Sequence, residues 1–149
     1  MTNPENFLAL EGLLLARLGA QLADLSPKVH ILAAADLAGI TEATQVTPAV
    51  HLVYQGYRVS ESRADGHATR LEQTWLATVA VRNLKDMRTG VAARVDAGLI
   101  AARVASALMG FVCTPGAKPL RLVDGPSAGF SAGYQYLPLA FVAEIVLSI

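Results

Sequence analysis

Cysteine and charge are both scarce in this chain of 149 residues. Cys113 is the one cysteine, so an intrachain disulfide is excluded and the chain suits a reducing compartment such as the cytosol. Lys and Arg total 12 and Asp and Glu total 12, which gives a formal net charge of zero. A neutral chain has no overall electrostatic attraction to nucleic acid or to anionic membranes. Charged residues make up only 16% of the chain, and a weakly charged surface favours self-association.

Long hydrophobic runs and nucleotide-binding motifs are also missing. Residues 8–15 are interrupted by Glu11, and residues 137–149 by Pro138 and Glu144. Both runs are shorter than the roughly 20 apolar residues that a transmembrane helix needs. The first residues lack the basic start of a secretory signal, and neither a P-loop nor a dinucleotide fingerprint occurs. We expect a soluble single domain over residues 1–149, without a cofactor.

Residues able to carry covalent chemistry are few and poorly spaced. The three histidines lie far apart, and no pair has the short spacing of a zinc site. Residues 125–129 read Gly-Pro-Ser-Ala-Gly, which matches the G-x-S-x-G pattern of a nucleophile elbow. That elbow needs a helix directly after the serine, and the following Phe-Ser-Ala-Gly does not begin one. We therefore predict no catalytic residue and no metal ligand. A small serine hydrolase that uses Ser127 is the alternative from a different class of protein.

The most informative feature that is present is an alternating segment over residues 46–83. It predicts two long antiparallel strands, at residues 50–59 and 71–82, with an Asp65-Gly66 turn between them. On the second strand we expect Leu71, Trp75 and Val79 to share the core face. On the first strand one face is expected to carry His51, Val53, Gln55, Tyr57 and Val59.

Helical and further strand signals surround this hairpin. Asn3 and Pro4 predict a helix start, and Ser26-Pro27 predicts its end. A second helix is expected over residues 89–109, with two apolar rows. The rows consist of Val91, Val95 and Leu99, and of Ile100, Val104 and Leu108. Short strands are expected at residues 29–35 and 120–123, a loop over residues 125–133, and a final strand at residues 134–149 that Pro138 bends or places at an edge.

This order of elements predicts an α+β fold. We expect a mainly antiparallel sheet of about four to five strands, flanked by two main helices that cover one of its faces. The other face would stay partly open in a monomer. Two polar segments are the candidate contact surfaces. The first is the hairpin tip, expected over residues 60–70 as a mobile projection, with Arg63, Asp65, His67 and Arg70; the second is the connection to the second helix, with Arg82, Lys85 and Arg88.

Four stretches in order along the chain resemble a known family. They are Thr-Pro-Ala-Val-His-Leu-Val-Tyr-Gln-Gly-Tyr at residues 47–57, Gln-Thr-Trp-Leu-Ala-Thr-Val-Ala-Val-Arg-Asn at 73–83, Ala-Gly-Leu-Ile at 97–100, and Gly-Tyr-Gln-Tyr-Leu-Pro-Leu-Ala-Phe at 133–141. Together they are similar to the tail terminator proteins of tailed bacteriophages, and most of all to the Mu-like tail proteins of that group. The likeness covers nearly the whole chain.

The resemblance implies a structural protein without a reaction, a cofactor or catalytic residues. It implies a homohexameric ring on the head-proximal end of the tail tube, which stops tube polymerisation and forms the joint to the head. Its partners would be other copies of the chain, the tail tube protein and a neck protein. Its place would be the neck-proximal end of the virion tail, after assembly in the host cytoplasm. A head-completion or head–tail joining protein is the alternative within the same class.

Overall fold

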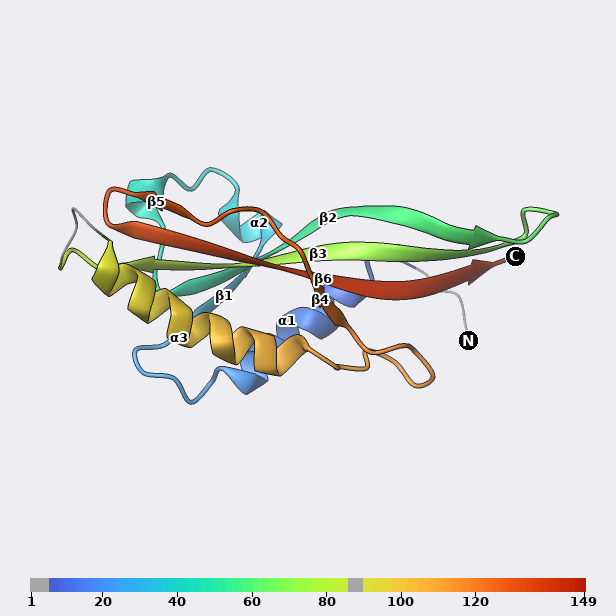
Figure 1. Cartoon of the computed structure of the whole chain (residues 1–149), viewed down its shortest axis with the longest axis horizontal. Coiled ribbons are helices and arrows are strands. Elements are labelled where there is room, and N and C mark those ends of the chain that lie inside the picture. The colour runs from blue at the N-terminus through green and yellow to red at the C-terminus, as the bar shows by residue number, and fades with distance from the viewer. Residues whose placement is uncertain (1–5, 86–89) are drawn as a thin grey trace.

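The computed structural model describes residues 6–85 and 90–149, and it has an α+β fold (Figure 1). A mixed sheet of six strands has the order β1-β2-β3-β6-β4, and β5 also pairs with β6. The strands are β1 His30–Ala33, β2 Ala49–Ser62, β3 Ala68–Arg82, β4 Arg121–Val123, β5 Gly129–Ser131 and β6 Tyr134–Ser148. The helices are α1 Leu10–Gln21, α2 Ala34–Leu37 and α3 Val91–Leu108, with the 3₁₀ turn η1 at Glu42–Thr44.

The predicted α+β class is confirmed, and the sheet differs in detail from the prediction. It has six strands in place of four to five, and β1 pairs with β2 in parallel, whereas the pairings of the other strands are antiparallel. The predicted loop at residues 125–133 contains the short strand β5. The described residues form three α-helices and a 3₁₀ turn, where two main helices were expected.

The two long helices cover one face of the sheet, as Figure 1 shows. Leu14 and Leu18 of α1 are completely buried, together with Trp75 of β3 and Phe141 of β6. The side of α3 that faces the sheet is lined by small residues, which lets the helix approach the strands closely. Its buried residues are Ala93, Ala97, Ala101, Val104, Ala107 and Leu108.

Three strands extend beyond these helices and form a projecting arm. We define the arm as residues 57–62 of β2, 68–73 of β3 and 143–148 of β6, which pair side by side. Figure 1 shows the arm at one end of the long axis, with the hairpin tip at its end. The loops that carry α2, η1 and β5 cover the opposite face of the sheet at the other end. We call the face of the arm that points away from α1 and α3 the open face.

A β-bulge in β2 changes which residues share a face. Pairing shifts from Tyr54 opposite Trp75 to Gly56 opposite Thr74, so Gln55 is the extra residue. Gly56 has φ +139°, a conformation that L residues rarely adopt. The prediction that one face carries His51, Val53, Gln55, Tyr57 and Val59 is therefore wrong. The bulge places Tyr57 opposite Gln73 and Val59 opposite Leu71, on the side of the helices.

The hairpin tip is much shorter than predicted. Strand β2 continues to Ser62 and β3 begins at Ala68, which leaves only residues 63–67 outside the strands. Cross-strand ion pairs explain the extension, because Arg58 pairs with Glu72 at 3.3 Å and Arg70 with Glu61 at 2.7 Å. Polar side chains at these positions thus belong to paired strands. The expected projection over residues 60–70 is mostly strand.

Element ends also differ from the prediction. The expected helix start at Asn3 and Pro4 lies outside the described residues, and α1 is assigned from Leu10 to Gln21 without reaching Ser26. Helix α3 matches the predicted helix within two residues at each end. Pro138 lies at an edge, as expected. On the side of β6 away from β3, β5 pairs with β6 up to Tyr136 and β4 pairs with β6 from Ala140. Pro138, which lacks an N–H, lies between these two pairings.

Candidate functional site

The charged residues of the hairpin tip bind one another. Arg63 forms a two-point ion pair with Asp65, whose Oδ1 accepts a hydrogen bond from the Arg63 Nε at 2.8 Å. The same oxygen accepts the backbone N–H of His67 at 3.0 Å. The Arg63 guanidinium, followed by this backbone hydrogen bond, lowers the pKa of Asp65 below its usual value. These contacts order the tip, and the role of its residues in binding a partner stays a prediction.

Arg70 lies on the open face of the arm and belongs to a different cluster. Its guanidinium contacts Glu61 at 2.7 Å and Glu144 at 3.3 Å. Lys118 contacts the same Glu144 at 3.5 Å, and a second group joins Arg58 and Arg121 through Glu72. We call these seven residues the charge ladder: Arg58, Glu61, Arg70, Glu72, Lys118, Arg121 and Glu144. It crosses all four strands of this part of the sheet.

The predicted basic connection lies at the other end of the molecule. Arg82 places its guanidinium 5.0 Å from the centre of the Tyr134 ring. The backbone N–H of Lys85 donates to Asn83, whose amide in turn donates to Asp96 of α3 at 2.8 Å. Arg88 lies outside the described residues. The connection is therefore anchored to the start of α3, while the side chain of Lys85 is exposed.

The two predicted surfaces do not form one site. Arg70 and Arg82 lie on the same strand, β3, and at about 3.3 Å per residue they are roughly 40 Å apart. Figure 1 shows the tip and the start of α3 at opposite ends of the long axis. A partner that contacts both ends of one subunit must be large, or two partners must each contact one end.

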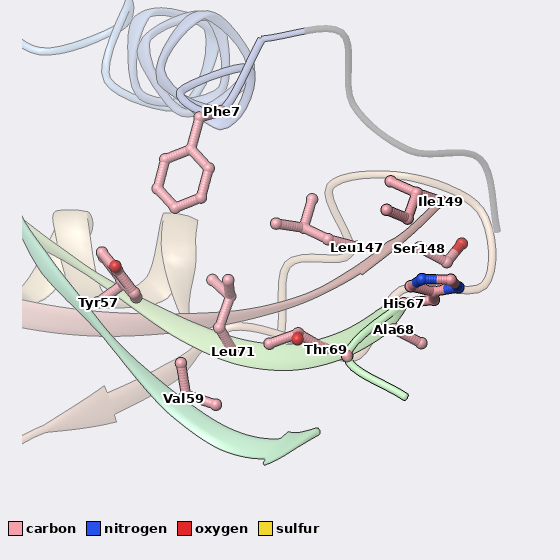
Figure 2. Close-up of a pocket in the computed structure, with 11 residues that line it drawn as sticks. Phe7, Tyr57, Val59, His67, Ala68, Thr69, Leu71, Leu147, Ser148 and Ile149 are labelled. Atoms are coloured by element: carbon pink, nitrogen blue, oxygen red, sulfur yellow. The ribbon is translucent and has the colours of Figure 1, made fainter. Parts of the chain in front are cut away.

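The helix side of the arm holds an apolar pocket that the sequence did not predict. Figure 2 shows Phe7 pointing from the turn before α1 toward the sheet, with Leu147 near the end of β6 and Ile149 just beyond it. The pocket has a volume of about 320 Å³. Tyr57 and Val59 line it and are 59% and 48% exposed. A glycine inside a strand pattern signals a bulge, so Gly56 was the signal for this face.

A second apolar surface lies on α3. Of the two predicted rows, the structure buries Val104 and Leu108 and leaves Val91, Val95 and Leu99 exposed, with Leu99 68% accessible. A pocket of about 460 Å³ lies beside this row, lined by Leu99 and by the segment that follows α1. The sequence predicted both rows but could not say which of them faces the sheet.

The candidates for covalent chemistry are not assembled into a catalytic group. Ser127 is exposed, and the element that follows it is the strand β5, whereas a nucleophile elbow needs a helix. Burial raises the pKa of the Cys113 thiol to about 11, so the reactive thiolate is scarce at neutral pH. Burial also lowers the pKa of His51 on β2. The serine hydrolase reading thus lacks its defining local structure.

The described residues offer neither a metal site nor a membrane-spanning helix. Within residues 6–85 and 90–149, no group of three or more His, Cys, Asp or Glu side chains could hold a metal ion. In the described part of the chain, no helix has the length and apolarity required to cross a bilayer.

The exposed features gather at the two ends of an α+β domain, in an apolar pocket, an apolar helix row and two charged clusters. Exposed apolar patches of this kind are typical of surfaces that contact other proteins. The family described as phage tail terminator protein matches residues 5–149, nearly the whole chain. The chain belongs to this family, which makes it a structural component of a phage tail. No curated protein matches it.

Proposed function

We propose that the chain terminates the tail tube by forming a hexameric ring on its head-proximal end. The ring stops further addition of the tube protein and then presents a surface to a neck protein, which makes the joint between head and tail. The observation that carries the proposal is the family match over residues 5–149. No reaction and no cofactor take part in this function.

The arrangement of surfaces supports a ring. A closed ring with one kind of subunit uses a heterologous contact, in which one patch meets a different patch on the next copy. This chain has different exposed patches in different places, the pocket of the arm and the Val91-Val95-Leu99 row of α3. Its formal net charge is zero, so copies do not repel one another as they come together.

The native mass of the purified chain at high concentration tests the ring. We expect a species of six times the chain mass of 15.7 kDa in native mass spectrometry and in light scattering. A hexamer that persists on dilution supports an autonomous ring. A dimer as the largest species would contradict the hexamer, because a two-fold contact closes after two copies.

A further inference from the structure

We propose that the two outer edges of the arm bind each other between copies of this chain, with β6 of one copy lying beside β2 of the next. The inference rests on the proposed ring and names the contact that builds it. It makes the sheet continuous from one subunit to the next.

Both edges of the arm lack a neighbouring strand within the described residues. Strand β1 pairs with β2 only up to Leu52, which leaves residues 53–62 without a strand on their outer side. Strand β4 pairs with β6 only as far as Val142, which leaves residues 143–147 also without a strand on their outer side. Such edges present rows of N–H and C=O groups that can accept another strand.

The β6 edge is regular, and Glu144 is the one charged residue among residues 143–147. Its register with β3 runs over the whole strand without a shift, and residues 143–147 include no proline, glycine or lysine. The β2 edge has two register shifts, and residues 56–59 form the regular stretch between them. A short pairing between residues 56–59 of one copy and residues 143–147 of another fits both edges.

The side chains on the two edges match on both faces of the sheet. On the helix side, Tyr57 and Val59 of β2 share a face with Ile145 and Leu147 of β6. Joining the edges continues this apolar face and covers Tyr57 and Val59, which are 59% and 48% exposed in the single chain. Such burial favours association of the two copies.

The open face provides charge complementarity. Arg58 of β2 has a side chain that is 72% exposed, and Glu144 stands on the same face at the β6 edge. Edge pairing brings the Arg58 of one copy toward the Glu144 of the next. Glu144 then links the charge ladder of one subunit to Arg58 in the ladder of the next.

Strand direction makes this contact compatible with a ring. Both β2 and β6 are antiparallel to β3, so they run in the same direction. A rotation axis along the strands keeps that direction in every copy, and β6 then pairs with the next β2 in parallel. Each copy uses one edge of each kind, as a closed heterologous ring requires. Pairing of β6 with β6 would give only a two-fold dimer.

Cross-linking between single-cysteine variants tests the inference. In a Cys113→Ser background we would prepare Val59→Cys and Leu147→Cys separately, mix them, allow assembly, and add a short bismaleimide. Each chain then has a single thiol, so every cross-link joins two copies. We expect a cross-linked dimer in the mixture of the two variants and none in either variant alone.

The other outcomes overturn the inference in distinct ways. A cross-link in Leu147→Cys alone indicates a two-fold β6 contact. A cross-link only between Val59→Cys and Leu99→Cys indicates that the arm binds α3 of the next copy. A hexamer by native mass without the 59–147 cross-link refutes the edge contact and leaves the ring intact, whereas a chain that stays monomeric in the mixture refutes the contact and the autonomous ring together.

Discussion

Single side chains on the open face show how the fold uses its few charges. Arg70, Glu72 and Glu144 each contact partners on neighbouring strands. The side chains of Arg58 and Arg70 are exposed, whereas those of Glu72 and Glu144 are only 20% and 19% exposed. Surface ion pairs contribute roughly 0.2–1 kcal/mol each. Their main effect is on geometry, because opposite charges placed across strands fix the register of the arm on its open face.

Tyr136 is a polar residue whose contribution to stability can be isolated. Its hydroxyl donates to Glu42 and accepts from the Gln45 amide at 2.7 Å, which ties the η1 loop to the sheet. We expect Tyr136→Phe to lower the free energy of unfolding by about 1 kcal/mol at neutral pH. The urea midpoint measures this change, and an unchanged midpoint would show that the two hydrogen bonds contribute nothing.

The same residue predicts a dependence of stability on pH. Burial, followed by the hydrogen bond with Glu42, raises the pKa of Tyr136 from 10.0 to about 12. The folded state therefore keeps this proton at pH values where the unfolded state loses it. Its contribution to stability is complete below about pH 10 and disappears as pH rises through the folded pKa. The fall in the urea midpoint across this window should be smaller in Tyr136→Phe than in the unmodified chain.

Residue types in the sequence identified the charged candidates but not their partners. Arg63, Asp65 and His67 do lie together at the tip, as their spacing indicated. Arg70 belongs to the charge ladder through Glu144, which is 74 positions further along the chain. Pairing between distant strands decides such contacts, and no local pattern contains that information.

At the scale of elements, the bulge in β2 has the largest consequence. It reverses the alternation after Gln55 and turns Tyr57 and Val59 toward the helix side of the arm. Without it the apolar pocket in Figure 2 would lose the side chains of this strand. The one extra residue thus places the apolar side chains of this edge strand on the face that the proposed contact between copies would cover.

A glycine-to-alanine change tests the bulge. Alanine at Gly56 must adopt φ +139°, and such strain costs about 1–3 kcal/mol. No heavy atom lies within 4 Å of the added Cβ, so the loss in unfolding free energy comes from the backbone. Gly98→Ala is the matched control, because that site is an open helical position where alanine adds roughly 0.5–1 kcal/mol. Equal stability of the two variants in urea would refute the assigned bulge conformation.

Strong periodic signals predicted the long elements correctly, and weak local signals failed. The helix α3 and the hairpin of β2 and β3 appear close to their predicted ranges. Strand β5 was missed because its three residues lie in a stretch rich in Gly, Ser and Pro. The parallel pairing of β1 was missed because direction depends on the path of the intervening loop, which periodicity does not record.

At the scale of the whole molecule, the domain is asymmetric along its long axis. One end carries the arm with its pocket and free edges, and the other carries the anchored connection at Asn83 and Lys85 and the start of α3. The membership of the chain in the phage tail terminator family gives this asymmetry a meaning. In the proposed function, the chain presents different surfaces to its neighbours in a ring, to the tail tube and to the neck protein.

The growth of tail tubes in the presence of the chain tests the central claim most directly. Tube protein from the same phage would be polymerised with and without the purified chain, and tube lengths measured by electron microscopy. We predict tubes that stop growing once the chain is added, each with extra density at one end only. Tubes that keep the length distribution of the untreated sample and show no end density would contradict termination.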